Sequence, residues 1–370
     1  MTDLQRDLQR SWEQRPAVVY GLGFWNQKSM QGMLAHLPGE VIFSRSFDKA
    51  LKRAQRDGAS LFCWTTRLSE DQRRQADEAD VPIVNVEDGF IRSVGLGAAL
   101  VPASSLILDG RGIYYDPSQP SDLEWMLETW ELTDEERARG ARMRTLAVEY
   151  KVSKYNLGSR EVVDHFPSER EKILVPGQVS DDAAILKTRS DSLPLSSGEN
   201  PNLLLLKRVR QDNPDAYIVY KPHPDVTSGL RNGTIAEREV LALADRQETA
   251  ADIIGLIEQC DVVETISSLS GFEALLRGKQ VVVHGQPFYA GWGVTKDHTS
   301  FVRRTKRRQL DDLVYLTLVQ YPSYVSPIDF RSCQGEDVIF ALSELRLTNR
   351  KKIIGYINFW IAKMAALLGW

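Results

Sequence analysis

Short apolar runs alternate with longer segments of mixed polarity along most of the chain. Runs of about four to six apolar residues are typical of strands in a buried parallel sheet, and mixed segments between them favour helices. Strands are predicted at 17–21, 41–43, 60–64, 82–86, 105–108, 172–176, 216–220, 261–265 and 280–284. Helices are predicted at 29–36, 47–57, 69–79, 200–213, 250–259 and 270–277. Residues 121–155 form a charged, helical stretch between the two halves.

This alternation predicts the α/β class, with two Rossmann-like domains that face a cleft. Open α/β sheets bind ligands at the carboxyl ends of their strands. A polar break at 166–170 separates the halves. The predicted limits are 1–167 and 168–310 for the two α/β domains, 311–349 for C-terminal helices packing across them, and 350–370 for an amphipathic helix. Nucleotide-sugar glycosyltransferases, some epimerases, certain kinases and binding proteins share such an architecture.

Composition narrows the class of protein. The 370 residues are 42% hydrophobic with a net charge of −4, which indicates a folded protein without a global nucleic-acid signature. Three cysteines without a CxxC pair predict a reducing compartment, and five histidines without HxxxH spacing predict no zinc site. The charged start MTDLQRDLQR is not a signal peptide, and no run of about 20 apolar residues predicts a span. We therefore expect a cytosolic protein, or one on the cytosolic side of a membrane.

The segment KPHPDV (221–226) follows a predicted strand. Two prolines stiffen the backbone around His223. A rigid histidine can donate a hydrogen bond to a phosphate leaving group, and Lys221 can add charge. The alternative is a proline-rich turn with a surface histidine, and the pattern weighs the two about equally.

The segment ETISSLSGFEALLRG (264–278) runs from a strand end into a helix. Small residues at a helix start leave backbone N–H groups free for a phosphate, and Ser267, Ser268 and Ser270 add hydroxyls. Glu273 has the position to accept from ribose hydroxyls. The alternative is ordinary capping, because Ser270 and Glu273 fit the S-x-x-E capping box.

Two further segments carry candidate chemistry. In PGQVSDDA (176–183), Asp181 or Asp182 either faces the cleft or caps the next helix. In GQPFYAGWG (285–293), Tyr289 and Trp292 either cover a sugar or base or pack between the domains.

The stretch VEDGFIRSVGLG (86–97) joins a strand to a glycine-rich loop. Its glycines do not match G-x-G-x-x-G, and its carboxylates lie where a phosphate loop needs donors. An acid/base carboxylate at the strand end, Glu87 or Asp88, therefore fits better than a phosphate cradle.

These segments together resemble one family, the KpsC-type capsule polysaccharide β-Kdo glycosyltransferases. The resemblance rests on EDGFIR (87–92), DGRGIYYD (109–116), SKYN (153–156), PGQVSDDA, KPHPDV, GFEALL (271–276) and QPFYAGWG (286–293), and runs from about 18 to 329. The EDG and His-Pro pair also occurs in bacterial sialyltransferases, whose donors are CMP sugars. The resemblance implies a GT-B fold and a metal-independent, retaining transfer from CMP-Kdo without a cofactor.

The resemblance also implies roles for single residues. Asp182 would be the nucleophile that forms a Kdo adduct, and Glu87, favoured over Asp88, would activate the acceptor hydroxyl. The donor site would use Gln178, Lys221, His223, Pro224, Ser267, Ser268, Ser270 and Glu273. Kdo or the acceptor would be bound by Arg92, Lys154, Tyr155, Gln286 and Trp292, because cations suit a carboxylate. The first domain would select the acceptor and the second would bind CMP-Kdo.

The chain departs from the best-known members, which carry two such modules, because it has one. PGQVSDDA and YGLGFW (20–25) resemble the module that makes the 2→7 linkage. The implied acceptor is a glycolipid or a Kdo-terminated glycan, and other capsule-assembly proteins are expected partners. The alternatives are a sialyltransferase-like enzyme for another CMP-nonulosonate and a non-catalytic scaffold of capsule assembly.

The C-terminal segment 350–370 lies outside the resemblance. Apolar residues at helical spacing, with tryptophans and flanking cations, favour a helix on the surface of the inner membrane, and the basic stretch 303–308 could assist it. The alternatives are a last helix packed on the core for the tail and a solvated face for the basic stretch. We expect peripheral attachment to the cytoplasmic face.

Overall fold

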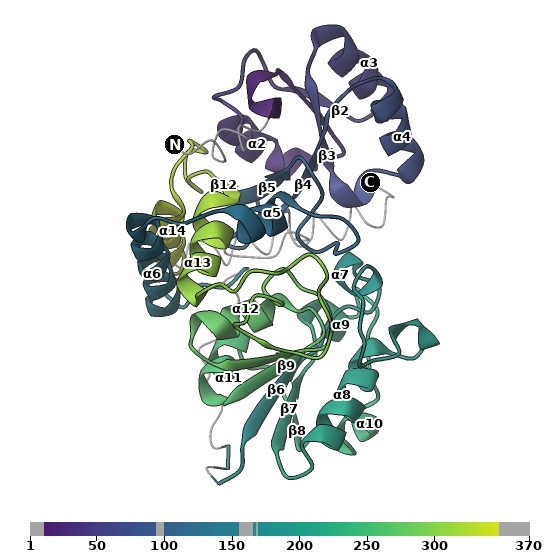
Figure 1. Cartoon of the computed structure of the whole chain (residues 1–370), viewed down its shortest axis with the longest axis vertical. Helices are drawn as coiled ribbons and strands as arrows, with labels where there is room; N and C mark the ends of the chain where they lie inside the picture. Colours follow the sequence, from purple (N-terminus) through teal and green to yellow (C-terminus); the bar gives the residue numbers. More distant parts are fainter. Residues whose placement is uncertain (1–10, 94–99, 155–165, 168, 348–370) are drawn as a thin grey trace. The chain divides into compact units, whose positions relative to one another are not determined.

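The computed structural model of the protein describes all residues except 1–10, 94–99, 155–165, 168 and 348–370. Internal contacts divide it into two compact units (Figure 1). The first comprises Met1–Ile113, Ser121–Leu157 and Val314–Trp370, and the second comprises Tyr114–Pro120 and Gly158–Leu313. The first unit is discontinuous because a strand near the C-terminus joins its sheet. The domain limits drawn from the sequence stay predictions.

The first unit is built on a six-stranded sheet with the order β12-β5-β4-β3-β1-β2. Its strands are β1 (Ala17–Tyr20), β2 (Ile42–Ser44), β3 (Ser60–Trp64), β4 (Ile83–Asp88), β5 (Ser105–Asp109) and β12 (Pro322–Tyr324). The strands β1 to β4 are parallel, whereas β5 runs antiparallel to both β4 and β12. The fully parallel sheet predicted for this half is therefore wrong at β5. The described part of the β4–β5 connection contains no helix, and a parallel crossover usually needs one.

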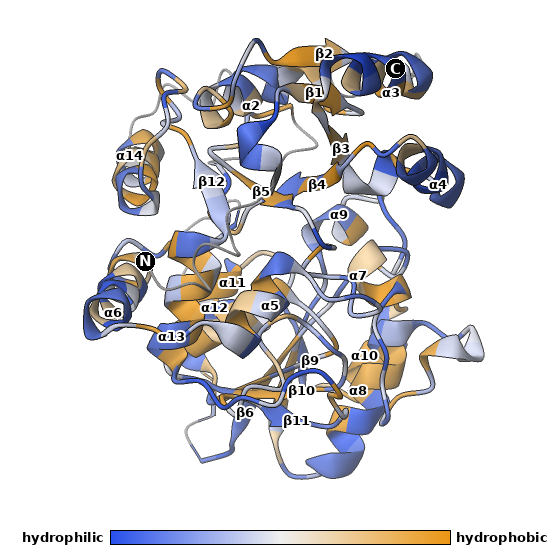
Figure 2. Cartoon of the chain, turned by 45° about the horizontal axis from the view of Figure 1, so that its top comes forward, coloured by the Kyte–Doolittle hydropathy of each residue, from blue (hydrophilic) through white to orange (hydrophobic). Residues whose placement is uncertain are grey.

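Helices cover both faces of this sheet. The helix α2 (Gln27–Met33) packs its methionines against one face, with Val19, Phe62 and Val84. The other face carries α3 (Phe47–Asp57) and α4 (Glu70–Glu78), which meet Val18 and Leu61. Further helices of the unit are α5 (Asp122–Thr129), α6 (Asp134–Glu149) and α14 (Gly335–Leu347). The helix α13 (Leu310–Val314) ends the second unit and leads into a π-helical turn of the first unit at Tyr315–Gln320. In Figure 2 the strands are mostly apolar in colour, whereas α4 and α6 are largely hydrophilic.

The second unit has a six-stranded sheet with the order β11-β10-β9-β6-β7-β8. Its strands are β6 (Lys172–Pro176), β7 (Tyr217–Lys221), β8 (Arg246–Gln247), β9 (Val262–Thr265), β10 (Gln280–Val283) and β11 (Lys296–Asp297), and all of them are parallel. The chain proceeds from β6 towards β8 and then returns to the other side of β6 with β9. The boundary between β6 and β9 is thus the topological switch point, where open α/β sheets bind ligands.

Alternating side chains of β6 explain how this sheet is covered. Ile173 and Val175 pack with Leu205 and Leu206 of α8 (Pro201–Asp212) and with residues of α10 (Glu237–Leu241). The opposite side of the sheet is covered by α11 (Ile253–Gln259) and α12 (Leu269–Leu276) (Figure 1). Two four-residue helices, α7 (Ala183–Leu186) and α9 (Pro224–Thr227), follow the carboxyl ends of β6 and β7. The α/β fold class predicted from the sequence is confirmed, and the ends of its predicted strands shift by one or two residues.

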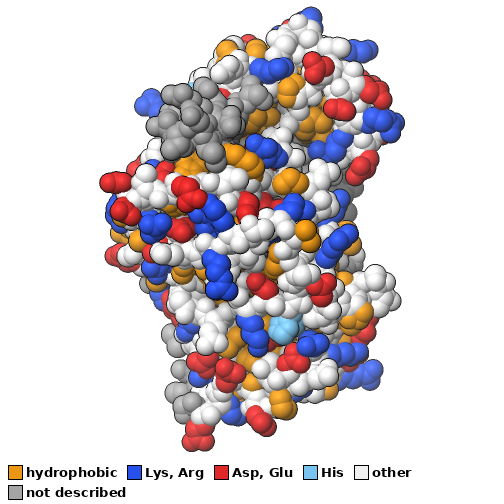
Figure 3. Space-filling view, viewed as in Figure 1, with side chains coloured by type: hydrophobic (Ala, Val, Ile, Leu, Met, Phe, Trp, Pro, Cys, Tyr) orange, Lys and Arg blue, Asp and Glu red, His pale blue; other side chains and the backbone are white. Residues whose placement is uncertain are grey.

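The surface agrees with the small net charge. Figure 3 shows basic and acidic side chains interspersed over the face in view, without a large area of one sign. Among the described residues, no helix is both long and apolar enough to cross a membrane.

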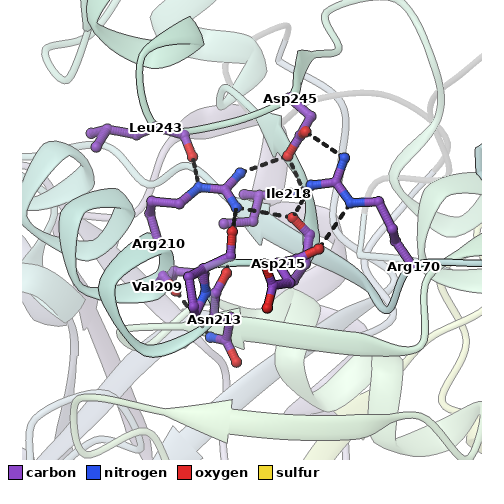
Figure 4. A network of polar contacts seen from close by, with 10 residues as sticks. Arg170, Val209, Arg210, Asn213, Asp215, Ile218, Leu243 and Asp245 are labelled. Carbon is purple, nitrogen blue, oxygen red and sulfur yellow. Dashed lines mark hydrogen bonds and ion pairs between the residues drawn. The ribbon is translucent and has the colours of Figure 1, made fainter.

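A polar network stabilises the amino ends of the second sheet (Figure 4). Asp245 pairs with Arg170 at 2.9 Å and with Arg210 at 2.6 Å, and it accepts the N–H of Ile218 at 3.0 Å. Arg210 also donates to the carbonyls of Leu243 and Ala216. Burial acts to raise the pKa of Asp245, but the hydrogen bonds from Ile218, Arg210 and Arg170 lower it overall.

Because the pKa of folded Asp245 is lowered, its stabilising effect is present above the unfolded Asp pKa of about 3.9 and is lost as the pH falls through the folded-state pKa. We expect Asp245→Asn to lower the free energy of unfolding by about 1–3 kcal/mol at pH 7. Urea unfolding at pH 7 and near pH 3 should show the difference shrinking at the lower pH. Asp215→Asn, whose side chain is exposed, is the matched control. An equal difference at both pH values would contradict the role of the ionised carboxylate.

Candidate active site

Gln178 spans the switch point of the second sheet. It follows β6, and its side-chain N–H donates to Ser267 Oγ, after β9, at 3.1 Å. The Oε1 atom accepts the N–H of Ser267 at 3.0 Å and the hydroxyl of Thr265 at 3.3 Å. Only 8% of Gln178 is exposed. Gln178 therefore fixes the serine loop to the end of β6, and its contribution to donor binding stays a prediction.

The serine loop (Ser267–Ser270) starts α12 in a defined conformation. Ser268 is the N-cap and accepts the N–H of Ser270 at 3.2 Å. The buried hydroxyl of Tyr289 donates to the Ser268 carbonyl at 2.6 Å. A Cβ at Gly271 would lie 2.2 Å from that hydroxyl, so only glycine permits this approach. The capping box of Ser270 with Glu273 is wrong, because the helix is capped by Ser268 instead.

Glu273 lies on α12 with 7% of its surface exposed. The guanidinium of Arg277, one turn later, donates to the Glu273 carbonyl at 2.9 Å. Burial lowers the pKa of Arg277, and the charges of Glu273 and Glu258 oppose that effect. Glu273 is thus a buried carboxylate near the partly buried cation of Arg277, and its predicted ribose contact stays a prediction.

The two adjacent aspartates after β6 differ in their surroundings. Asp181 pairs with Arg231 at 3.0 Å and accepts from the Asn232 side chain at 2.9 Å. Asp182 occupies the N-cap position of α7, but its side chain makes no cap hydrogen bond. Its exposed carboxylate has no hydrogen bond or ion pair with any residue that the structure describes. The capping alternative is therefore wrong for the Asp182 side chain, which remains available to a ligand.

His223 begins α9 directly after β7. The N–H of Asp225 donates to His223 Nδ1 at 3.1 Å, so the proton of the neutral ring lies on Nε2. Pro224 occupies the first turn of α9, as its fixed φ favours. Lys221 instead donates to the Thr249 carbonyl at 2.6 Å, and burial lowers its pKa. The structure thus gives His223 a donor nitrogen and directs the Lys221 ammonium to the backbone.

The aromatic loop after β10 is packed rather than open. Tyr289 and Trp292 are fully buried, and Trp292 Nε1 donates to the Phe288 carbonyl at 2.8 Å. The Gln286 side chain donates to the Ser300 carbonyl at 2.8 Å. The sugar contact predicted for Trp292 is wrong, because its side chain is fully buried. The bond to Phe288 is a packing contact inside the second unit, and the alternative of packing between the domains stays a prediction.

The sequence patterns indicated no role for His284, a buried histidine. His284 lies at the end of β10 with its side chain fully buried, where Nε2 contacts Glu264 at 2.7 Å and Nδ1 contacts the Ser192 hydroxyl at 2.8 Å. These partners are far apart along the chain, and no motif connects them. The network ties the segment after α7 to the centre of the sheet.

In the first unit, Glu87 and Asp88 are the last residues of β4. Adjacent residues of a strand point to opposite faces, so the two carboxylates cannot share one role. Asp88 Oδ1 lies 2.7 Å from Nε of Arg92, which is 1% exposed. Glu87 Oε1 accepts the N–H of Asp88 at 3.0 Å. The ion pair occupies Asp88, and the acid/base role of Glu87 stays a prediction.

Arg92 is also held by its backbone. Its N–H donates to the Lys154 carbonyl at 3.1 Å, and its Nη1 donates to Ser93 Oγ at 2.9 Å. The structure therefore brings the backbones of Arg92 and Lys154 together. The buried guanidinium of Arg92 pairs with Asp88. Tyr155 lies outside the described residues.

Comparisons with known proteins identify the family of the chain. The family described as capsule polysaccharide biosynthesis protein matches residues 59–170 and 143–329. The capsule polysaccharide modification protein LipA of Neisseria meningitidis serogroup B is 39% identical over 317 residues, which cover 85% of this chain and 44% of LipA. The lipopolysaccharide-processing protein LpsZ of Rhizobium meliloti is 38% identical over 73% of this chain and 61% of LpsZ. The chain thus spans less than two thirds of the length of these relatives.

Two solved structures from Thermosulfurimonas dismutans KpsC are similar over nearly their whole length. The β-Kdo 2,7 transferase has a TM-score of 0.71 and 33% identity, with 90% of this chain and 99% of that chain covered. The β-Kdo 2,4 transferase has a TM-score of 0.75 and 30% identity, with 89% and 98% covered. These matches confirm the resemblance predicted from the motifs. With two α/β units of the GT-B type, the chain belongs to the capsule polysaccharide biosynthesis family and is similar to the KpsC β-Kdo transferases.

Proposed function

We propose that the protein is a retaining glycosyltransferase that moves β-Kdo from CMP-β-Kdo to a Kdo-containing acceptor of a surface polysaccharide. The observation that carries this proposal is the state of Asp182. It lies after the switch-point strand β6 as an exposed carboxylate without a described partner, while its neighbour Asp181 is paired. A nucleophilic carboxylate needs this availability. Similarity to the two KpsC β-Kdo transferases supports Kdo as the sugar, and CMP-Kdo as the donor is proposed from the motif resemblance.

The first step joins the sugar to the enzyme. A carboxylate oxygen of Asp182 attacks C2 of Kdo, the bond between C2 and the phosphate oxygen breaks, and CMP leaves. Kdo has no hydroxyl at C3, so C2 readily gains oxocarbenium character. The Nε2–H of His223 is suited to donate to the departing phosphate, since the cap hydrogen bond keeps Nδ1 as an acceptor.

The hydroxyls of the serine loop complete the donor site in this proposal. Ser268 fixes the start of α12 by accepting the Ser270 N–H, and the Ser270 hydroxyl lies in the first turn, where an anion is favoured. Glu273 would accept from the ribose. Gln178 would keep the serine loop at the end of β6 while the phosphate charge changes.

The second step releases the sugar to the acceptor. The acceptor hydroxyl attacks C2, the bond to Asp182 breaks, and Glu87 takes the hydroxyl proton. Two displacements at C2 retain the configuration. Asp88 has a different task, because its ion pair with buried Arg92 stabilises the end of β4.

The finer specificity is part of the proposal. The two solved transferases resemble the chain to similar degrees, so the 2→7 linkage is proposed from PGQVSDDA and YGLGFW alone. Neither a metal ion nor a cofactor takes part. Transfer is therefore expected to persist in EDTA.

The deciding experiment measures CMP release and protein mass together. The protein is incubated with CMP-Kdo, and intact-mass and peptide mass spectrometry look for one Kdo residue on the peptide that contains Asp182. Parallel incubation with CMP-sialic acid tests the sialyltransferase-like alternative. An adduct with CMP-Kdo alone supports the proposal. Turnover of CMP-sialic acid but not CMP-Kdo overturns the donor, and no turnover of either favours a scaffold.

Attachment to the cytoplasmic face of the inner membrane is also proposed, because a lipid-linked acceptor would be found there. The segment 350–370, which lies outside the described residues, carries the sequence features of a surface helix. Deleting residues 350–370 is expected to release the protein from anionic liposomes in a flotation assay. The full chain on neutral liposomes is the control, and unchanged binding of the shortened chain would refute the role of this segment.

A further inference from the structure

Arg231 and Asn232 form a clamp on the residue that precedes the candidate nucleophile. Arg231 Nη2 donates to Asp181 Oδ1 at 3.0 Å, and Asn232 Nδ2 donates to Asp181 Oδ2 at 2.9 Å. The N–H of Ser180 donates to the Asn232 carbonyl at 3.0 Å. Both oxygens of Asp181 and the backbone beside it are thus held by the same two residues.

The clamp is also attached to the His-Pro loop. The N–H groups of Leu230 and Arg231 donate to the Asp225 carbonyl at 3.0 and 3.1 Å. The N–H of Asp225 in turn donates to His223 Nδ1 at 3.1 Å. A continuous path of hydrogen bonds and backbone therefore connects His223 with the segment that carries the nucleophile.

The cation of the clamp, Arg231, also changes the charge beside Asp182. Two adjacent carboxylates repel each other, and such repulsion favours protonation of one of them. The hydrogen bond from Arg231, opposed by desolvation and assisted by Asn232, lowers the pKa of Asp181. Arg231 thereby offsets the negative charge of Asp181, while Asp182 keeps a carboxylate without a described partner.

We infer that Arg231 and Asn232 are positioning residues for Asp182, and that they act through Asp181. The clamp fixes where the backbone of Asp182 lies, because it holds both carboxylate oxygens of Asp181 and the N–H of Ser180. This inference rests on the proposed function of Asp182.

The clamp contributes little to folding, which makes it testable. The side chains of Arg231 and Asp181 are 42% and 46% exposed. Ion pairs so exposed add little stability. We therefore expect Arg231→Gln to change the unfolding midpoint by no more than about 3 °C.

The test measures CMP release in single turnovers over a range of CMP-Kdo concentrations. Arg231→Gln is expected to lower the maximal rate about tenfold, because the segment that carries Asp182 loses its anchor, while the CMP-Kdo concentration that gives half the maximal rate stays unchanged. Arg231→Lys keeps a cation for Asp181 and should retain most of the rate. The double variant Asp181→Asn with Arg231→Gln should be no slower than the slower single variant, because Arg231 acts through Asp181.

Two outcomes would overturn the inference. One is a wild-type rate in Arg231→Gln, and the other is a double variant whose loss equals the combined losses of Asp181→Asn and Arg231→Gln. An unchanged maximal rate with a higher half-maximal CMP-Kdo concentration would also refute it, since that pattern indicates a lost donor contact and not a displaced nucleophile.

Failure of the proposed function gives a different pattern. If the wild-type protein neither releases CMP from CMP-Kdo nor forms an adduct, the proposed function fails, and hydrogen exchange of the 178–187 segment then tests the clamp. Faster exchange of that segment in Arg231→Gln than in Asp215→Ala supports the clamp as a device that orders this segment. Equal exchange in the two variants overturns it.

Discussion

Replacing Asp182 with alanine is expected to lower CMP release and sugar transfer from CMP-Kdo by on the order of 10³-fold or more. No adduct mass should form, because the attacking oxygen is gone. The fold should be unaffected, since the Asp182 side chain is exposed and makes no cap hydrogen bond. We expect the free energy of unfolding to change by less than about 0.5 kcal/mol.

The matched control for this variant is Asp215→Ala. Asp215 is an exposed carboxylate near the amino end of β7, whereas Asp182 follows the carboxyl end of β6. Its replacement should change neither turnover nor stability. Transfer at the normal rate by Asp182→Ala would refute the nucleophile and with it the double displacement.

Replacing Glu87 is expected to reduce transfer to the acceptor, whereas replacing Asp88 is expected to reduce stability. Glu87→Gln should slow transfer to the acceptor by about 10²–10⁴-fold, because the proton of the acceptor hydroxyl has no base. The first step does not need that base, so the Kdo adduct should accumulate. Single-turnover mass spectrometry with and without acceptor measures both quantities.

Asp88→Ala should instead destabilise the first unit. It leaves the guanidinium of Arg92, which is 1% exposed, without its carboxylate partner. Breaking a buried ion pair in this way costs about 3–5 kcal/mol. Urea unfolding checks the stability, and the fraction that remains folded should still form the adduct. A stable Asp88→Ala variant that accumulates adduct, beside a fully active Glu87→Gln variant, would reverse the two assignments.

The strands of the fold could be predicted because their signal is local. The buried strands β6 and β9, for example, are short apolar runs between polar segments, and the structure places them within a residue of the prediction. The order of strands in a sheet is not local. The strand β5 pairs antiparallel with β4 and with β12, which comes from a distant part of the chain. The hydrophobic periodicity of a strand does not reveal its pairing partner, so these pairings could not be predicted.

The candidate site residues, too, could be predicted only where their signal is local. Asp182, His223 and the serines were found because each follows a predicted strand, and strand ends form the ligand-facing edge of a parallel sheet. The burial of Trp292 was not accessible in this way. A GQPFYAGWG loop is compatible with an open or a packed aromatic ring, and only its neighbours in space distinguish them.

The sequence by itself determined the alternation of strands and helices, the position of each candidate side chain at a strand end, and the motif series that indicates the family. The motif resemblance favoured Asp182 and Glu87, but only the tertiary structure showed which contacts separate the members of each carboxylate pair. Asp181 is held by Arg231, fifty positions further along the chain, which leaves Asp182 available. Asp88 is held by Arg92 because β4 ends there and the chain turns back. The physical reason is that adjacent residues of the same charge look alike in a sequence, whereas partners and burial, which set their chemistry, depend on contacts in space.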